Sequence, residues 1–442
     1  MQYPRLALSV CMIGALIGGT VFAQGDSQQV RAVRSVSLDY HSYYAQDPPA
    51  PEPEPGAVFA TPTAVDAAAC DACGGHGSDC ESSCDSCGHG QLGDCCLGEP
   101  WTLTGYLHPD HEPRTKVGGW VAAGYYNKTN GLFNTDPNQL NNTQSNIYLE
   151  READGSNGWD LGYRFDILYG TDAQNTQAFG NPPGSWDFQN GFDHGIYGWA
   201  LPQLYFDVAY GNWKVRAGKF YTPVGYEVVA APQNFFYSHG ISHNNSEPFT
   251  HTGAYAEYDA GNDVKYYGGW TAGWDTGFDQ FGSGSSFLGG FAAPVVDDVT
   301  FTYMLTAGDF GFLGDDAYAH SLIFNVDLAD RWEYVLTSDV LRVSSTGHDT
   351  VGITQYLFYE FNDCWKAGVR AEWWKGDSVA GYTMGNQFLP PVAGTASYYE
   401  TTFGVNYKPQ ANLVVRPEMR YQWAPYSDFD QWVFAIDGIV TF

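Results

Sequence analysis

The sequence predicts an all-β protein, a single closed antiparallel β-barrel that crosses a membrane with about sixteen strands. Three observations lead to this prediction. Segments of about ten residues alternate apolar with polar side chains, Trp and Tyr lie near the ends of many of them, and the connections are alternately short and long. The last segment is the clearest, because Trp432, Phe434, Ile436, Val440 and the C-terminal Phe442 share one face. This pattern is typical of a strand whose outer face meets lipid.

The composition agrees with an all-β fold. The 442 residues include 52 Gly and 31 Tyr but only 5 Met, and no segment keeps the i, i+3, i+4, i+7 apolar spacing of an amphipathic helix. A formal net charge of −30 argues against a nucleic-acid-binding protein. No apolar run after the N-terminus reaches the roughly 18 residues of a membrane-spanning helix. A membrane-spanning form must therefore be a closed barrel, since hydrocarbon cannot satisfy open sheet edges.

The first 23 residues have the organisation of a secretory signal peptide. Arg5 precedes the apolar run Leu6–Ile17, and Val21-Phe22-Ala23 has the small-x-small pattern of a cleavage site. We therefore expect cleavage after Ala23. The next residue, Gln24, is not the cysteine that lipid attachment requires, so a lipid anchor is not expected.

Residues 24–99 are predicted to form a flexible periplasmic segment ahead of the barrel domain, 100–442. The tract Pro48–Pro55 is rich in Pro and Glu, which is typical of an extended spacer. Seven cysteines follow: Cys70, Cys73, Cys80, Cys84, Cys87, Cys95 and Cys96. Export favours disulfides among them, the two Cys-x-x-Cys pairs have the spacing of a structural zinc site, and a flexible, partly oxidised segment is the third interpretation. Because seven is odd, one thiol is expected to stay free or to pair with another chain.

Alternation and turn residues predict the strands in order along the chain. They are 116–126, 143–153, 158–170, 200–210, 213–222, 250–259, 264–275, 286–295, 299–307, 318–328, 332–343, 350–361, 365–375, 397–407, 413–423 and 431–442. Every second connection is short and the others are generally longer. Outer-membrane barrels have short periplasmic turns and long extracellular loops, whereas a soluble β-sandwich has no reason to sort its loops.

Four stretches of the ladder carry a family resemblance. They are Gly118–Tyr125 (GGWVAAGY), Val215–Glu227 (VRAGKFYTPVGYE), Asn234–His239 (NFFYSH) and Thr250–Gly253 (THTG). Through them the region from Trp101 to Phe442 resembles the OmpL-like family of β-barrel porins. The resemblance implies a pore in the bacterial outer membrane, surrounded by lipid. Phe442 resembles the terminal residue that the barrel-assembly machinery recognises in such proteins. The resemblance implies no particular solute and does not include the cysteine segment.

The loop at 223–249 is the candidate for the narrowest part of the channel. In the sixteen-stranded porins that this chain resembles, the third long loop folds into the lumen, and a barrel of this size otherwise encloses an open water-filled channel. The candidate constriction residues are Glu227, Asn234, Tyr237, His239, His243 and Glu247. The alternative is an exposed extracellular loop whose polar residues are solvated.

The strand register also predicts which charged side chains line the lumen. The wall candidates are Asp160, Arg164, Asp166, Asp207, Lys214, Arg216, Lys265, Asp275, Lys366, Arg370, Glu372, Arg416, Glu418 and Arg420. Glu257, Glu333, Asp339 and Asp437 add to the acidic side, so acids are in modest excess. We therefore expect passive diffusion of small hydrophilic solutes and ions with a weak cation preference. That preference should fade at high salt, because the screening length is only about 8 Å at physiological ionic strength.

The loop histidines allow a second interpretation. His239 and His243 are four residues apart and Glu247 follows four residues later, which is the spacing of a helical metal site. Gly240 and Pro248 oppose a regular helix here, so metal binding is the weaker hypothesis.

An enzyme is not predicted. His320 and its neighbour Ser321 should face opposite sides of one strand, and the chain has no Gly-x-Ser-x-Gly elbow. A structural or anchoring outer-membrane barrel remains the alternative to a porin. Zinc at the cysteines is the one cofactor left open, and a homo-oligomer is compatible with the pattern.

Overall fold

The computed structural model describes residues 95, 97–129, 133–279, 283–377, 395–425 and 429–442. The predictions for the signal peptide and the Pro/Glu spacer lie outside the described residues, as do those for Cys70, Cys73, Cys80, Cys84, Cys87 and Cys96. Within the described ranges, no helix has both the length and the apolar character needed to cross a membrane.

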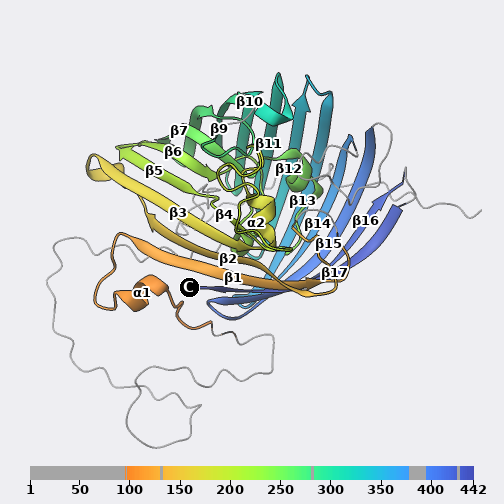
Figure 1. The fold of residues 1–442 in the computed structure, drawn as a ribbon. Helices are drawn as coiled ribbons and strands as arrows, with labels where there is room; N and C mark the ends of the chain where they lie inside the picture. Colours follow the sequence, from red (N-terminus) through yellow and green to blue (C-terminus); the bar gives the residue numbers. More distant parts are fainter. Residues whose placement is uncertain (1–94, 96, 130–132, 280–282, 378–394, 426–428) are drawn as a thin grey trace, which may run out of the picture. The chain divides into compact units, whose positions relative to one another are not determined.

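Seventeen strands form one antiparallel sheet that closes on itself (Figure 1). They are β1 Lys116–Tyr126, β2 Leu140–Arg151, β3 Asp160–Gly170, β4 Gly198–Ala200, β5 Leu204–Tyr210, β6 Trp213–Tyr221, β7 Thr250–Gly261, β8 Val264–Thr271, β9 Ser285–Val296, β10 Val299–Asp309, β11 Ala317–Ala329, β12 Trp332–Val343, β13 His348–Asn362, β14 Trp365–Asp377, β15 Thr395–Gln410, β16 Leu413–Ala424 and β17 Phe429–Thr441. The orange β1 pairs with the blue β17, from Trp120↔Thr441 to Tyr126↔Ala435, which closes the barrel.

Strands β4 and β5 together fill one position in the barrel wall. β4 pairs with the end of β3, where Leu168 lies opposite Ala200, and β5 pairs with its beginning. Pro202 lies between them and has no amide hydrogen to donate, so the ladder is interrupted there. With these two strands counted as one, the seventeen strands make sixteen wall positions. The predicted sixteen-stranded barrel is confirmed, and the predicted strand 200–210 is interrupted.

The largest difference in strand limits is at β8. The prediction extends to residue 275, but β8 ends at Thr271. Gly273 has a φ of 102° and Asp275 a φ of 48°, and these left-handed conformations turn the chain out of the strand. Asp275 therefore lies in the loop after β8 and not on a wall strand, which corrects its predicted place. Its carboxylate accepts the amide of Phe249 at 2.8 Å.

Side chains alternate between the two faces of the wall. On β17, Val433, Ala435 and Asp437 are buried inside, whereas Trp432 and Phe434 are exposed on the outside. Apolar side chains directed outward are what a lipid-facing barrel requires.

The short helices lie in the connections between strands. They are α1 Leu103–Leu107, η1 Gly155–Asn157, α2 Thr171–Thr176, η2 Ala231–Gln233, α3 Ile241–Ser246 and η3 Gly311–Leu313. At the long-loop end, the loops contribute Phe133, Phe179, Phe188, Val229, Phe249, Trp274, Phe310 and Leu313 to one buried apolar cluster. This cluster packs against the ends of β6, β11 and β12, so the long loops cover part of this end of the barrel.

The short-turn end holds the first described residues. Cys95 forms a disulfide with Cys364, which lies in the turn between β13 and β14. The side-chain amide of Asn412, in the turn between β15 and β16, donates to Trp101 O at 2.7 Å and accepts from Trp101 N at 2.6 Å. Cys364 was not predicted as a partner. Once Cys95 is paired with Cys364, six of the seven clustered cysteines remain. Because six is even, their number no longer requires one free thiol or a bond to another chain.

Candidate functional site: a loop held inside the barrel

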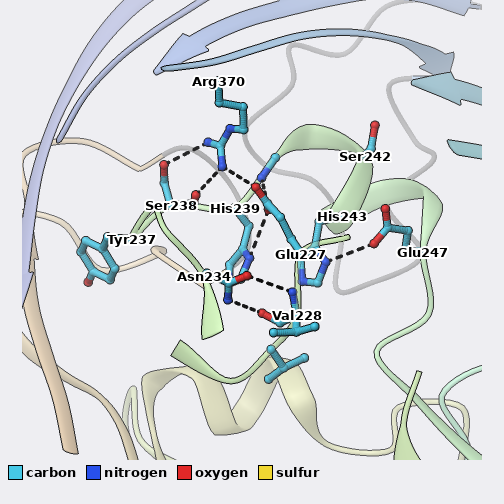
Figure 2. A network of polar contacts seen from close by, with 12 residues as sticks. Glu227, Val228, Asn234, Tyr237, Ser238, His239, Ser242, His243, Glu247 and Arg370 are labelled. Carbon is cyan, nitrogen blue, oxygen red and sulfur yellow. Dashed lines mark hydrogen bonds and ion pairs between the residues drawn. The ribbon is translucent and has the colours of Figure 1, made fainter. Parts of the chain in front are cut away.

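The connection between β6 and β7, residues 222–249, contacts the inner face of the barrel wall and is called the inner loop below (Figure 2). It includes η2 and α3, and α3 packs against β12, β13 and β14. Its predicted constriction residues Glu227, His239, His243 and Glu247 are all between 2% and 7% exposed. These side chains therefore lie in contact with protein and not in open solvent.

Local contacts give the first half of the inner loop its shape. The Asn234 side chain accepts from Val228 N at 3.0 Å and donates to Val228 O at 2.5 Å, so it closes a turn as a strand partner would. Gly225 has a φ of 109°, and a Cβ there would lie 2.1 Å from Glu247 Oε2. Only glycine permits both this conformation and the close approach of Glu247.

Arg370 on β14 is the central attachment point of the inner loop (Figure 2). Its Nη1 donates to Glu227 Oε1 at 2.6 Å and to Ser238 O at 2.7 Å, and its Nε donates to Glu400 Oε1 at 2.5 Å. The Arg370 side chain is fully buried. Because a buried guanidinium is costly unless its donors are satisfied, this contact set ties the loop to β14 and β15.

Two wall carboxylates accept backbone amides of the inner loop. Glu418 on β16 accepts from Tyr237 N at 2.9 Å and from Ser238 N. Glu372 on β14 accepts from Ile241 N and Ser242 N, both at 2.6 Å. Charge-assisted bonds of this kind are roughly twice as strong as neutral ones. Four loop amides thereby find partners on the wall.

Two wall arginines bind backbone carbonyls of the inner loop. Arg416 donates to Asn234 O at 2.6 Å and forms a double contact with Asp437, at 2.9 and 2.5 Å. Arg420 donates to His239 O at 2.5 Å. The predicted wall residues Arg370, Glu372, Arg416, Glu418 and Arg420 thus meet at the inner loop.

The remaining wall candidates lie elsewhere and pair with one another. The pairs are Arg164 with Asp166 and Glu150, Arg216 with Asp207, Lys214 and Lys265 with Glu257, and Lys366 with Glu333. Asp160 lies at the short-turn rim and pairs with Arg114 and Arg151. Glu400 and Glu150 were not among the predicted wall residues. The alternation of Tyr398, Glu400 and Thr402 with outward-facing neighbours is the signal that could have identified Glu400.

The two histidines of the inner loop stack on each other. Their ring centroids are 4.4 Å apart and the ring planes differ by 22°. His239 Nδ1 lies 3.4 Å from Glu227 Oε2, and His243 Nδ1 lies 3.3 Å from Glu247 Oε2 (Figure 2). A short helix, α3, does form between Gly240 and Pro248, although only over six residues.

Burial sets the protonation of these loop groups. Burial, with a further contribution from the other histidine, lowers the pKa of His239 to about 4. Burial lowers the pKa of His243 to about 4 as well. Burial and the nearby Glu227 raise the pKa of Glu247 well above its ordinary value. Burial opposes ionisation of Glu227, but the Arg370 guanidinium outweighs it and holds the Glu227 pKa well below its ordinary value. At neutral pH both imidazoles are therefore neutral and Glu227 is ionised, and the raised pKa of Glu247 favours its protonated form.

The His320–Ser321 pair has no catalytic geometry. Ser321 is fully buried on the inside of β11, whereas His320 is on the outward face, with Nδ1 2.6 Å from Tyr318 Oη. The two side chains point to opposite sides of the wall, so this serine and histidine cannot act as nucleophile and base.

Three solved structures of outer-membrane proteins are similar to this barrel in fold. The high-pH structure of Pseudomonas putida OprB aligns with a TM-score of 0.50 and 13% identity, over 74% of this chain and 94% of that one. The outer membrane channel DcaP of Acinetobacter baumannii aligns with a TM-score of 0.49 and 9% identity, over 74% and 96%. An anion-selective porin from Comamonas acidovorans aligns with a TM-score of 0.49 and 9% identity, over 74% and 99%.

No curated protein matches the chain in sequence. The family described as "Putative beta-barrel porin-2, OmpL-like" matches residues 114–442, which include every strand of the barrel. The chain therefore belongs to the OmpL-like β-barrel porin family and is a β-barrel protein of the bacterial outer membrane.

Proposed function

We propose that this protein is a diffusion porin in which the inner loop forms the constriction for small hydrophilic solutes and ions. The observation that carries the proposal is the attachment of this loop to the inner wall through Arg370, Glu372, Arg416 and Glu418. A loop held inside a barrel by charge-assisted hydrogen bonds narrows the interior in a fixed way. Constrictions of this kind, lined by charged rings, set the selectivity of channels.

The proposal includes a weak preference for cations. Around the inner loop, the carboxyl groups of Glu227, Glu372, Glu400 and Glu418 outnumber the guanidinium groups of Arg370, Arg416 and Arg420. Several of these charges compensate one another in ion pairs, and burial raises the pKa of Glu247, which disfavours its charge. The field that acts on a permeating ion is therefore small and is screened further by salt.

Single-channel recording of the purified protein in planar lipid bilayers tests the porin function. We expect stepwise conductance, and in a KCl gradient a small reversal potential of cationic sign that declines as the salt concentration rises. Protein unfolded by boiling is the control. Barrels that keep the folded mobility on an unheated gel but never conduct would contradict the proposal.

Two variants of the inner loop test the constriction. Glu227→Gln leaves the Arg370 charge less compensated, so the reversal potential should shift towards anions. Glu247→Gln changes the other carboxyl group of this loop, and because burial raises the pKa of Glu247 and so disfavours its charge, its effect on the reversal potential should be the smaller of the two. A reversal potential that Glu227→Gln leaves unchanged would remove this loop from the conducting path.

A structural or anchoring barrel is the second candidate function. The disulfide between Cys95 and Cys364 favours it, because this bond fastens the segment before the barrel covalently to a periplasmic turn. An absence of conductance, combined with loss of envelope attachment when residues 24–94 are deleted, would support anchoring over a porin.

A further inference from the structure

Three side chains of the inner loop form a compact set of potential metal ligands. One ligand atom each from Glu227, His239 and His243 lies within 4.8 Å of the other two, and all three residues are buried. Two neutral imidazoles and one carboxylate are a donor set that Zn²⁺ and related divalent transition ions prefer.

Two nitrogen atoms of this set make no hydrogen bond of normal geometry within the protein. His243 Nε2 has no hydrogen-bond partner, and His239 Nδ1 has a longer contact of 3.4 Å with Glu227 Oε2. A buried polar atom without a partner, as His243 Nε2 is, carries a desolvation cost that a bound ion would remove. The two nitrogens belong to the rings that stack at 4.4 Å, so both lie at the same place in the loop.

One distance in the set already suits a tetrahedral ion. Glu227 Oε2 and His239 Nδ1 are 3.4 Å apart. Two ligands at about 2.0–2.1 Å from a tetrahedral zinc are about 3.3 Å apart. The His243 ring would complete the set after a modest rotation, and the fourth position would hold water.

Glu247 is placed to orient the His243 ring. Its Oε2 lies 3.3 Å from His243 Nδ1, which leaves Nε2 as the nitrogen available to an ion. A carboxylate that holds the second nitrogen of a metal-bound histidine is the usual outer partner in zinc sites. Glu247 is in turn hydrogen-bonded to Asp339 on β12.

We propose that Glu227, His239 and His243 bind a divalent transition ion of the Zn²⁺ class inside the barrel, with Glu247 as a positioning residue. The ion would link the start of the inner loop, at Glu227, to α3 and the residue before it. It would thereby stiffen the loop. The site itself does not depend on the porin function, because its occupancy can be measured without any conductance.

Metal uptake by the full-length folded protein tests the site. We expect the wild type to bind one more equivalent of Zn²⁺ than a His239→Gln/His243→Gln double variant. His251→Gln removes a buried histidine that contacts Thr222 outside the set, so it is the matched control and should bind as the wild type does. Equal uptake by the wild type and the double variant would overturn the proposal.

Cobalt separates this site from the cysteine segment, which could also hold metal. The equivalent lost in the double variant should show the weak visible bands of Co²⁺ bound to nitrogen and oxygen, without the intense thiolate-to-cobalt absorption of a cysteine site. A lost equivalent with thiolate absorption would also overturn the assignment. For Glu247→Gln we expect Zn²⁺ affinity about 10–100-fold lower, and unchanged affinity would exclude the positioning role.

A footprint on the wild type covers the case in which the double variant does not fold. Cu²⁺ with ascorbate should oxidise His239 and His243, but not the exposed His194, because metal-catalysed oxidation is confined to the residues that hold the ion. The absence of oxidation at both loop histidines contradicts the site. In bilayers, Zn²⁺ should change the conductance noise of the wild type and not of the double variant. Metal uptake without any conductance would support the metal site and contradict the porin function.

Discussion

Two parts of the barrel wall, β14 to β17 and β9 to β11, contact the inner loop in different ways. Among the side chains that the structure describes on β14 to β17, seven buried charged ones face inward: Arg370, Glu372, Glu400, Arg416, Glu418, Arg420 and Asp437. On β9, β10 and β11, all of which the structure describes, none of the buried residues is charged. There Thr, Ser, Ala, Leu, Met and Ile side chains face inward, and Ile323 joins an apolar cluster with Phe235 and Phe236 of the loop.

The difference teaches what the interior charges do. On β14 to β17 they gather where the loop presents backbone amides and carbonyls that need partners, and five of the seven bind the loop there. On β11 the contact with the same loop is apolar: Ile323 packs with Phe235 and Phe236 in a cluster that continues through Val335 on β12 and Phe358 on β13. A polar residue on the inner face of such a barrel therefore need not face water, and a formal charge count overstates the field in the channel.

The largest effect is expected from Arg370→Met on the charged side. The variant leaves Glu227 buried without its arginine and leaves Glu400 with Arg420 as its remaining cation, and breaking a buried pair costs about 3–5 kcal/mol. Urea unfolding of the inserted barrel measures the cost, and protease should then cut the inner loop. Lys366→Met, an inward cation of the same strand with a partly exposed partner in Glu333, should cost at most about 1 kcal/mol. If the two variants lost the same free energy of unfolding, the contacts of Arg370 with the inner loop would stabilise the barrel no more than the Lys366–Glu333 pair does.

The loop histidines and Glu247 should give opposite pH dependences. The folded pKa of His239 and of His243 is about 4, below the ordinary 6.5, so their contribution to stability is present above pH 6.5 and is lost as the pH falls towards 4. The pKa of Glu247 is raised above 4.5, so its contribution is present below pH 4.5 and is lost as the pH rises. Each pKa unit corresponds to about 1.4 kcal/mol.

Unfolding at a series of pH values separates these two contributions. The His239→Gln/His243→Gln variant should gain stability relative to the wild type as the pH falls from about 6.5 to 4. Glu247→Gln should gain relative to the wild type as the pH rises from about 4.5. Parallel profiles of the wild type and both variants would show that these groups titrate as exposed ones do.

A smaller effect is expected from Glu418→Gln. The amide keeps one acceptor oxygen but loses the charge that strengthens the bonds from Tyr237 N and Ser238 N, so the loss should be about 1–3 kcal/mol. Glu257→Gln is the control, because Glu257 faces Lys214 and Lys265 and receives no loop amide. Faster proteolysis of the inner loop in Glu418→Gln, but not in Glu257→Gln, would show that the Glu418 charge holds this loop against the wall.

The smallest effect is expected from Thr302→Val on the uncharged side. The Thr302 hydroxyl is buried and has no partner within the protein, so its loss should leave stability within about 1 kcal/mol of the wild type or raise it. Urea unfolding measures this directly. A larger loss would mean that the hydroxyl has a partner, and a fall in conductance alone would place it beside the permeating water.

Most of the fold could be predicted from the sequence, because alternation is a local signal. The predicted limits 116–126 and 332–343 coincide with those of β1 and β12. The errors occur where the chain leaves regular strand geometry. Pro202 interrupts one strand, and Gly273 ends β8 although Trp274 continues the apolar pattern.

The site could be predicted only in part, because its contacts join distant segments. The position of the inner loop follows from strand order, and the inward side of each wall strand follows from its alternation. The partner of each charge depends on the register and tilt of strands that are far apart in the sequence. Arg370 and Glu227 are 143 residues apart, and nothing local to either residue predicts that they meet. Cys95 and Cys364, 269 residues apart, are a second example.

The disulfide also determines the path of a mechanical load. Strand β1 closes the barrel against β17 through seven residue pairs, and it is the first strand that a pull on the preceding chain would reach through the backbone. The bond from Cys95 to Cys364 diverts such a pull into the turn between β13 and β14, two long strands that are each paired on both sides. A force on the chain before Cys95 is therefore transmitted to β13 and β14, and the pairing of β1 with β17 does not bear it directly.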